Sequence, residues 1–437
     1  MGSRPITSGH KLLSKYLIGG GISEFTSHAS SCKSHNLMMR SQLIAPAATG
    51  TYHFPPLGMR ALEKLCKVID EEMSRIGCLK VTMGALSSAG PWKKSGRWES
   101  FGDELMKLEV SGALHCLNPT HEEAITGMVA ALGRIPLQNL PLKLYQISSK
   151  FRNEPRPRFG LLRCREFLMK DLYTFDEDMD CAKVSYDEIC SAYETIFRRL
   201  GLDFIKALSG SGNIGGEMSH EYLCPAAIGE DKVIVAEDGT AWNAELFNNR
   251  NSGAKHVETN AIEIGHAFLL DTVYSKPFNA KFVSKLGKPS SLSMGCYGLG
   301  VSRMLATCVE THSTDEYIRW PDEITPFKVC VIPPKRGSKE HLTLKDSVSS
   351  LYDNLDNSPM FSGDVVIHDK TSQSIGKRVR DCNVLGFPII VILGKGLLDP
   401  TPLAEVHFQN SNKITRVPLS DIAKVIENEF TLLVGCE

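Results

Sequence analysis

Two strand-like segments joined by a basic, proline-containing loop constrain the fold of this chain more than any other feature. Residues 142–154 and 165–175 are each predicted to form a strand. The run PRPRFG at 155–160 lies between them, and its two prolines cannot donate to a sheet ladder. The segment therefore predicts an antiparallel hairpin with a long basic tip.

Amphipathic helices are predicted on both sides of this hairpin. Apolar residues between Met59 and Ile76 recur three and four positions apart, with charged residues between them. Gly77 follows, where a glycine commonly ends a helix. Residues 180–200 show the same apolar spacing and predict a second long helix.

Beyond about residue 326, short strands and helices alternate. Strands are predicted at 327–332, 365–367 and 389–393, and helices at 341–355, 375–385 and 419–432. This alternation predicts an α/β domain whose helices cover a central sheet. Prolines at 321, 326, 333 and 334 place the domain boundary near residues 322–326.

Composition narrows the class of protein. The chain has 437 residues, with 49 Lys and Arg against 50 Asp and Glu, a length that suits roughly two or three domains. The richest apolar run, residues 388–393, is too short to span a membrane. Thirteen cysteines without a C-x-x-C pair indicate reduced thiols in a reducing compartment. With a net charge of −1, any nucleic-acid binding must come from local patches.

The first forty residues differ from the rest. Residues 1–41 carry five basic groups and a single acid, and they are rich in serine. This composition fits an organelle transit peptide, and an ordinary disordered tail fits it equally well. We therefore expect residues 1–40 to be a mitochondrial transit peptide or a disordered leader.

Three short segments could carry chemistry, although each has an ordinary structural explanation. NPTHEE at 118–123 could be a helix capping box, and the Arg and Glu of FRNE at 151–154 could form a surface ion pair. MGCYGLGVSR at 294–303 could be a tight turn, and Arg303 stands where a dinucleotide fingerprint needs glycine. The chain also lacks a Walker A phosphate loop and a G-x-S-x-G nucleophile elbow.

In this order, the segments resemble the class II aminoacyl-tRNA synthetases, and within that class the bacterial-type prolyl-tRNA synthetases. The resemblance runs from about Ser34 to the C-terminus, and the transit-like N-terminus favours the mitochondrial members. It rests on PTHEE (119–123), FRNEPRPRFG (151–160), REFLMKD (165–171), GEMSHE (216–221) and MGCYGLGVSR (294–303).

The resemblance implies both a fold and an activity. We expect an α+β catalytic domain built on an antiparallel sheet over residues 41–322, and a C-terminal α/β anticodon-binding domain over residues 326–437. The implied activity is ATP-dependent ligation of L-proline to tRNA(Pro) through a prolyl-adenylate, in the mitochondrial matrix. The family also implies a homodimer, and no membrane association is expected.

The resemblance assigns the ATP site residue by residue. Arg152 would hold the α-phosphate and the proline carboxylate, Glu154 the adenine amino group, and Arg303 the γ-phosphate. Arg152 and Arg303 are the expected catalytic residues, because this reaction depends on positioning and charge stabilisation. Phe167 would stack on adenine, Arg163 would help hold the nucleotide, and Glu263 is the candidate Mg²⁺ ligand.

The resemblance also implies contacts to proline and tRNA. Thr120 and Glu122 would bind the secondary ammonium of proline, Arg152 its carboxylate, and His266 and Cys296 would line the pocket around its ring. Basic residues would contact tRNA phosphates and the anticodon. They are Arg156 and Arg158 for the acceptor end, and Lys377, Arg378 and Arg380 for the anticodon.

Several positions depart from the family pattern. Gly84 stands where the first class-defining motif normally has proline, and Asn118 and Asp271 stand where glycine is usual. Only 17 residues (246–262) separate Glu245 from Glu263, which leaves no room for the editing domain of bacterial relatives. We therefore expect some alanine activation without editing in cis.

Two alternative functions remain open from the sequence. One is a catalytically inactive, synthetase-like protein that serves as a tRNA-binding or accessory subunit. The other is a class II synthetase for threonine, glycine or histidine. Arg152, Glu154 and Arg303 argue against the first, and the set Thr120, Glu122 and Cys296 argues against the second.

Overall fold

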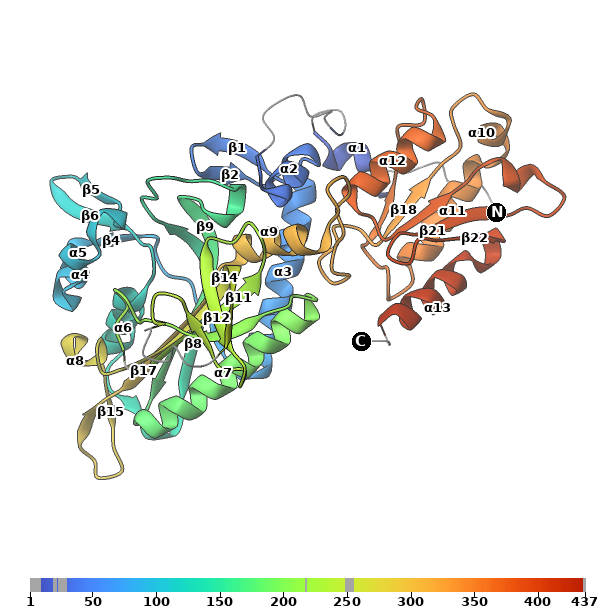
Figure 1. Cartoon of the computed structure of the whole chain (residues 1–437). Coiled ribbons are helices and arrows are strands. Elements are labelled where there is room, and N and C mark those ends of the chain that lie inside the picture. Colours follow the sequence, from blue (N-terminus) through green and yellow to red (C-terminus); the bar gives the residue numbers. More distant parts are fainter. Residues whose placement is uncertain (1–8, 19–21, 23–29, 217, 248–254, 435–437) are drawn as a thin grey trace.

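The computed structural model describes residues 9–18, 22, 30–216, 218–247 and 255–434. These residues form two domains, one around a nine-stranded sheet and one around a five-stranded sheet (Figure 1). No helix within the described ranges combines the length and the apolar character that a membrane crossing requires.

The predicted hairpin forms the centre of the larger domain. Strand β8 (Leu142–Phe151) pairs antiparallel with β9 (Glu166–Asp176), in a ladder that runs without a break from Leu142 opposite Phe175 to Phe151 opposite Glu166. The sheet order is β11-β10-β13-β12-β14-β17-β9-β8-β3, with a further pairing of β11 and β14. The remaining strands are β3 (Leu79–Lys80), β10 (Ile205–Leu208), β11 (Met218–Pro225), β12 (Asp231–Ala236), β13 (Ala241–Asn243), β14 (His256–Asp271) and β17 (Ser293–Leu299).

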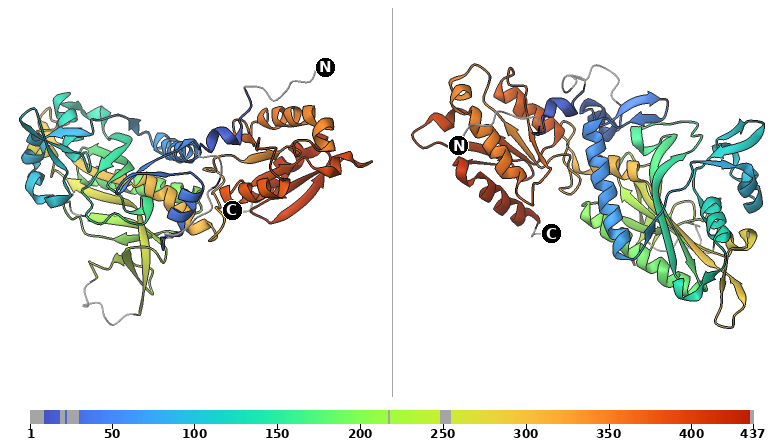
Figure 2. Two further views of the ribbon diagram at one scale, coloured as in Figure 1. Left: turned by 90° about the horizontal axis from the view of Figure 1, so that it is seen from above. Right: turned by 180° about the vertical axis from the view of Figure 1, so that it is seen from behind.

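Three helices cover one face of this sheet. Helices α7 (Met179–Arg199) and α9 (Val301–His312) pack on the strands, and α3 (Pro56–Arg75) packs against both, as the view from behind shows (Figure 2). The buried side of α3 includes the predicted apolar residues Leu62, Leu65, Ile69 and Met73, whereas Met59 is 40% exposed. Gly77 after the helix has a φ of +73°. The apolar spacing therefore identified both long helices.

A small subdomain, residues 86–117, was not predicted. It contains a separate sheet of β4 (Leu86–Ser88), β6 (Ala113–Leu117) and β5 (Lys107–Val110), with helices α4 (Ala89–Ser95) and α5 (Arg97–Ser100). Its own apolar cluster includes Trp92, Trp98 and Phe101. Helix α4 packs against α6 (Glu122–Ala131), so the subdomain supports the start of α6.

Smaller elements complete the larger domain. A hairpin lies near the N-terminus, and a second three-stranded sheet lies beside α8. They are β1 (Ala45–Ala48), β2 (Thr51–His53), β7 (Ile135–Pro136), β15 (Lys281–Val283), β16 (Pro289–Ser291) and α8 (Ser275–Phe278).

The C-terminal domain has the predicted α/β architecture. Strands β19 (Val365–Ile367), β18 (Val329–Ile332) and β20 (Ile389–Ile392) are parallel neighbours. An antiparallel pair, β21 (Ala404–Phe408) and β22 (Lys413–Val417), extends the sheet and was not predicted. The helices are α10 (Lys339–Thr343), α11 (Lys345–Asp356), α12 (Ile375–Leu385) and α13 (Ile422–Val434).

The prediction of a disordered leader over residues 1–40 is wrong for the described part of that segment. Helix α2 (Lys33–Arg40) packs on α9, where the Ser34 N–H donates to the Glu310 carboxylate. Apolar side chains drive this packing, which the segment's polar average composition concealed. Residues 1–8, 19–21 and 23–29 of the predicted transit peptide lie outside the described residues.

Residues 10–17 attach to the C-terminal domain. Leu12 forms an isolated parallel bridge with Ile367 at the free edge of β19, and α1 (Leu13–Tyr16) follows it. The Ser14 N–H and hydroxyl donate to the Asp369 carboxylate over 2.9 and 2.5 Å. Leu13 and Leu17 are buried. This segment is therefore a structural part of the fold.

Removing residues 1–18 should lower thermal stability, because buried Leu13 and Leu17 each contribute about 1.5–3 kcal/mol. Removing residues 1–8 alone is the matched control, since it keeps these contacts. Differential scanning calorimetry should show a lower unfolding temperature for the longer deletion than for the shorter one. Equal unfolding temperatures for both deletions would contradict this description.

Candidate functional site

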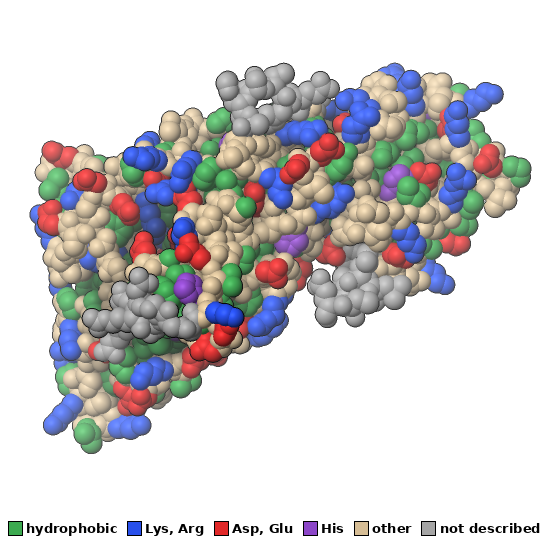
Figure 3. Space-filling view, in the orientation of Figure 1, with side chains coloured by type: hydrophobic (Ala, Val, Ile, Leu, Met, Phe, Trp, Pro, Cys, Tyr) green, Lys and Arg blue, Asp and Glu red, His purple; other side chains and the backbone are tan. Residues whose placement is uncertain are grey.

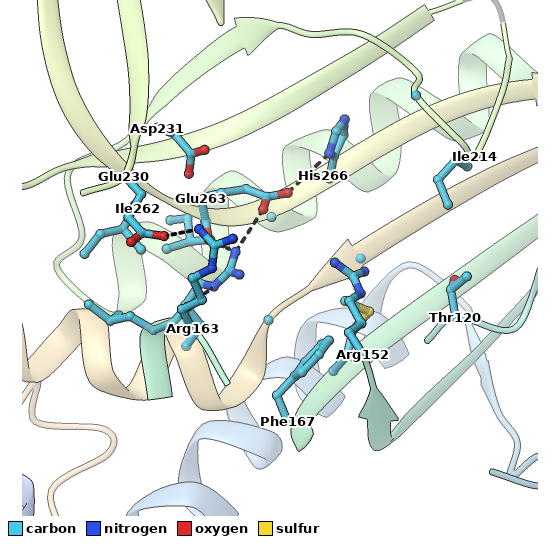
Figure 4. Close-up of a pocket in the computed structure, with 18 of the residues that line it drawn as sticks. Thr120, Arg152, Arg163, Phe167, Ile214, Glu230, Asp231, Ile262, Glu263 and His266 are labelled. Atoms are coloured by element: carbon cyan, nitrogen blue, oxygen red, sulfur yellow. Dashed lines mark hydrogen bonds and ion pairs between the residues drawn. The ribbon is translucent and has the colours of Figure 1, made fainter. Parts of the chain in front are cut away.

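A cavity of about 610 Å³ opens at the loop end of the central hairpin. The hairpin β8–β9, strands β14 and β17, the start of α9 and the loop 210–214 all contribute to its lining. Figure 4 shows Arg152, Phe167, Glu263 and His266 around this space, and Thr120 at its far end. The structure thus brings the predicted ATP and proline residues to one cavity.

Three arginines, Arg152, Arg163 and Arg303, line the cavity and give it positive charge. Arg152 follows β8, and its guanidinium lies 5.3 Å from the centre of the Phe167 ring. Among the described residues, Arg152 Nε has no hydrogen-bond partner, and burial lowers the pKa of this guanidinium. An anion in the cavity would satisfy both its charge and its free donor.

Arg303 is held firmly on the first turn of α9. Its Nε donates to the Leu162 carbonyl over 3.0 Å, and its Nη1 donates to the Glu263 carboxylate over 2.8 Å. Burial alone would lower the pKa of Arg303, but Glu263 raises it above its ordinary value. Arg303 therefore stays charged at the cavity wall.

Glu263 contacts Arg303 and His266 and lies near two further carboxylates, Glu221 and Asp231. Burial would raise the pKa of Glu263, but the hydrogen bond with His266 and the charge of Arg303 hold it well below its usual range. Burial, and then the charge of Glu263, raise the pKa of nearby Asp231 to about 6. Ligand atoms of Glu221, Glu263 and His266 lie within 4.8 Å of one another, and hard carboxylate oxygens are the ligands that Mg²⁺ prefers.

His266 is fixed by partners on both ring nitrogens. Its Nδ1 lies 3.3 Å from Glu263 Oε1, and its Nε2 lies 2.5 Å from the Ser219 hydroxyl. Its ring stacks on Phe268 at 3.9 Å between centroids. Glu221, a motif residue without an assigned role in the sequence, accepts from Asn243 over 2.7 Å and stands beside His266.

Ion pairs close the hairpin tip. Arg163 Nε lies 2.8 Å from Glu154, and its Nη1 lies 2.6 Å from Glu230. Arg158 also pairs with Glu230, whereas Arg156 is exposed beyond the cavity. Glu230 was not predicted, because a lone acid in a turn gives no sequence signal.

The far end of the cavity is built around a buried carboxylate. Glu122 is fully buried, and its Oε1 accepts from the Thr120 hydroxyl over 2.7 Å and from the Cys296 thiol over 3.1 Å. Its Oε2 accepts from Arg97 Nη1 over 2.9 Å. The predicted set Thr120, Glu122 and Cys296 is therefore in direct contact, and Arg97 is an additional member that the sequence analysis missed.

A buried polar network fixes the loop that carries Thr120. The Tyr173 hydroxyl accepts from the His121 N–H over 2.9 Å and donates to Asp171 over 3.0 Å. Asp171 also pairs with Lys150 over 2.6 Å, and both side chains are almost completely buried. The hairpin strands thus set the position of the cavity floor through this network.

The three departures from the family pattern have structural counterparts. Asn118 Nδ2 donates to the Gly84 carbonyl over 2.9 Å and to the Ser87 hydroxyl over 2.8 Å. Two of the departures therefore contact each other, and Asn118 secures the turn that lacks proline. Asp271 has a φ of +49°, the left-handed conformation in which glycine is usually preferred.

The proposed anticodon patch needs correction at Arg378. Lys377 and Arg380 are exposed on α12, but Arg378 is fully buried and its Nη1 approaches the His368 carbonyl at 3.5 Å. Arg378, Cys382 and Leu385 occupy the inner face of α12 at helical spacing. The same spacing in the sequence could have identified Arg378 as a residue on the buried face.

Family comparisons match both domains. The model described as "tRNA synthetase class II core domain (G, H, P, S and T)" matches residues 109–312, and "Anticodon binding domain" matches residues 328–429.

Curated relatives align over most of the chain. A probable mitochondrial proline–tRNA ligase of Mus musculus is 45% identical over 391 residues, which cover 88% of this chain and 82% of the relative. A proline–tRNA ligase of Ehrlichia ruminantium is 37% identical over 404 residues, which cover 88% and 92%.

Solved structures share the fold at lower identity. A Giardia lamblia prolyl-tRNA synthetase in complex with prolyl-adenylate has a TM-score of 0.77 at 18% identity, over 92% of this chain and 80% of that chain. A Cryptosporidium parvum prolyl-tRNA synthetase complexed with halofuginone and AMPPNP has a TM-score of 0.73 at 18% identity, over 93% and 78%.

Substituting Asp171→Asn should destabilise the protein by about 3–5 kcal/mol, because it leaves the buried Lys150 ammonium without its counter-charge. The double substitution of Lys150→Met with Asp171→Asn should cost less, since no buried charge then remains unpaired. Urea unfolding measures both losses. A double variant as unstable as the single variant would contradict the ion pair's assigned role.

Proposed function

The chain belongs to the proline–tRNA ligases, which are class II aminoacyl-tRNA synthetases, and from this premise we propose how its cavity performs the reaction. Proline and ATP bind side by side between Glu122 and Arg303. The prolyl group then passes to tRNA(Pro), in the mitochondrial matrix. The observation that carries the proposal is one cavity with the buried carboxylate of Glu122 at one end and the guanidinium groups of Arg152 and Arg303 at the other.

ATP is held at the arginine end. The Arg152 guanidinium, with its free Nε, neutralises the α-phosphate and the proline carboxylate as they approach each other. Because that carboxylate is already ionised, positioning and charge neutralisation lower the barrier, and no general base is required. Phe167 supports the adenine, Glu154 accepts from its amino group, and Arg163 and Arg303 hold the remaining nucleotide.

Proline is held at the opposite end. Its secondary ammonium donates to Glu122 and to Thr120, which already contact each other. The stacked rings of His266 and Phe268 and the thiol of Cys296 border the space for the pyrrolidine ring.

Mg²⁺ fits the carboxylate cluster beside Arg303. Glu263 would hold the ion, with Glu221 as a further oxygen ligand close to it. A bound Mg²⁺ supplies neutralisation of the ATP phosphates. Glu263 also accepts from Arg303 Nη1 and lies within hydrogen-bond distance of His266 Nδ1.

The proposed tRNA contacts lie outside the cavity. Arg156 and Arg158 at the hairpin tip suit acceptor-end phosphates, and exposed Lys377 and Arg380 suit the anticodon. Basic and acidic side chains are interspersed on the face shown in Figure 3, in keeping with local rather than overall attraction to RNA. A mitochondrial location is supported by the relatives whose names place them in mitochondria, and the matrix is our proposal within it.

A homodimer is also proposed. Strand β3 lies at the edge of the central sheet, and apolar Leu79, Leu86 and Leu114 are exposed around it and on the adjoining subdomain. An exposed apolar edge of this kind favours pairing with a second chain.

Proline-dependent ATP–pyrophosphate exchange tests the proposed reaction. Arg152→Ala should reduce exchange by at least about a hundredfold, because the developing charge loses its main partner. The control is Arg156→Ala, which removes an exposed arginine from the same hairpin. This variant should keep wild-type exchange and weaken only tRNA charging. Exchange with threonine instead of proline, or undiminished exchange in Arg152→Ala, would contradict the proposal.

The short connection before β14 leads to a prediction about fidelity. We propose that this chain lacks editing in cis, since residues 246–262 leave no space for a further domain. A cavity that fits proline discriminates against a smaller amino acid by only about 1–3 kcal/mol per missing methylene. Alanine should therefore be activated measurably, and alanyl-tRNA(Pro) should persist. Its rapid hydrolysis by this chain alone would refute the prediction.

A further inference from the structure

Arg97 occupies an unusual position behind the cavity floor. It begins α5 in the small subdomain, and only 5% of its surface is exposed. Its guanidinium carbon lies 5.0 Å from the Trp92 ring, 5.2 Å from Phe101 and 5.6 Å from Tyr274. These aromatic rings leave the side chain little freedom, so its charge is fixed in place.

The Arg97 guanidinium contacts two buried carboxylates. Arg97 Nη1 lies 2.9 Å from Glu122 Oε2, and 3.1 and 3.2 Å from the two oxygens of Glu123. Ser95 donates to Glu123 over 2.7 Å. With both acids ionised, the group carries one net negative charge. A single monovalent cation, such as the proline ammonium, would neutralise it.

Glu122 depends on this partner. Burial would raise the pKa of Glu122, and Arg97 is the largest influence that lowers it below its ordinary value, followed by Thr120 and Cys296. For Glu123, burial raises the pKa and outweighs Arg97, and Glu122 raises it further. Removing Arg97 would therefore leave two adjacent buried carboxylates competing for one proton.

We propose that Arg97 is a positioning residue for proline recognition, which keeps the Glu122 carboxylate ionised and oriented toward the cavity without itself touching the substrate. The inference rests on the proposed binding of proline by Glu122. Lysine could not replace Arg97 fully, because a compact ammonium cannot stack among three aromatic rings as the planar guanidinium does.

Other charged and titratable groups also face Glu122, and each of them contributes to the pH at which this carboxyl loses its proton. Arg97, with Glu123, dominates on the side away from the cavity. The other groups are His121, Lys150, Arg152, Asp171, Tyr173, Tyr274 and Cys296.

Steady-state kinetics of Arg97→Met and Arg97→Lys test the proposal. In Arg97→Met, the KM for proline should rise by about ten- to a hundredfold, while the KM for ATP stays within about twofold. The acid limb of kcat/KM for proline should move to higher pH, because Glu122 then binds its proton more readily. Arg97→Lys should lie between this variant and the wild type.

Two further variants separate positioning from general stability. Arg199→Met removes an arginine that likewise joins two helix carboxylates, Glu71 and Glu72, and also pairs with Glu323. Arg199 does not line the cavity, so this variant should leave the KM for proline unchanged. Adding Glu123→Gln to Arg97→Met removes the competing acid, and it should restore part of the proline affinity.

An Arg97→Met enzyme with the wild-type proline KM and pH profile would overturn the inference. If Arg97→Met does not fold, the proline KM and the pH profile are measured for Arg97→Lys, with and without Glu123→Gln. Wild-type values in both of these variants would overturn the inference. A wild-type enzyme without proline-dependent exchange would instead refute the proposed function.

Discussion

The fully buried carboxylate of Glu122 is the group on which the arrangement of the cavity depends. A charge removed from water is tolerated only when donors surround it. Here they come from the loop before α6, from β17 and from the small subdomain, through Thr120, Cys296 and Arg97. The need to satisfy this one group therefore ties together segments that are far apart in the sequence.

The charges of the cavity are separated along its length. An anion lies at the floor, and the guanidinium groups of Arg152 and Arg303 lie nearer the nucleotide end. A zwitterionic amino acid placed between them would have its ammonium and its carboxylate facing complementary charges. Arg303 is already held by Glu263, whereas Arg152 keeps a free donor in the described structure. Arg303 is therefore suited to a fixed contact with the nucleotide, and Arg152 to a contact with the reacting groups.

Local patterns in the sequence predicted much of this molecule. The proline-containing loop fixed the central hairpin, helical spacing identified α3 and α7, and motif order grouped the cavity residues. Contacts between distant segments were not predictable in the same way. Arg97 and Glu230 act only through partners that folding brings near, and no local pattern marks them. The helical spacing of Arg378 with Cys382 and Leu385 could have predicted its burial. We instead grouped Arg378 with its basic neighbours as a surface patch. The N-terminal residues were misjudged because average composition hides a few buried leucines.

Inhibition by tetrahydrofuran-2-carboxylate, in which oxygen replaces the ring ammonium of proline, tests the recognition of that ammonium by Glu122 most directly. In proline-dependent pyrophosphate exchange, the analogue's inhibition constant should exceed the proline KM by at least about a hundredfold in the wild type. In Glu122→Gln, the difference between the analogue's inhibition constant and the proline KM should become much smaller, because the neutral amide has no charge to attract the proline ammonium. An unchanged difference in that variant, or an analogue that binds the wild type as well as proline does, would contradict the account.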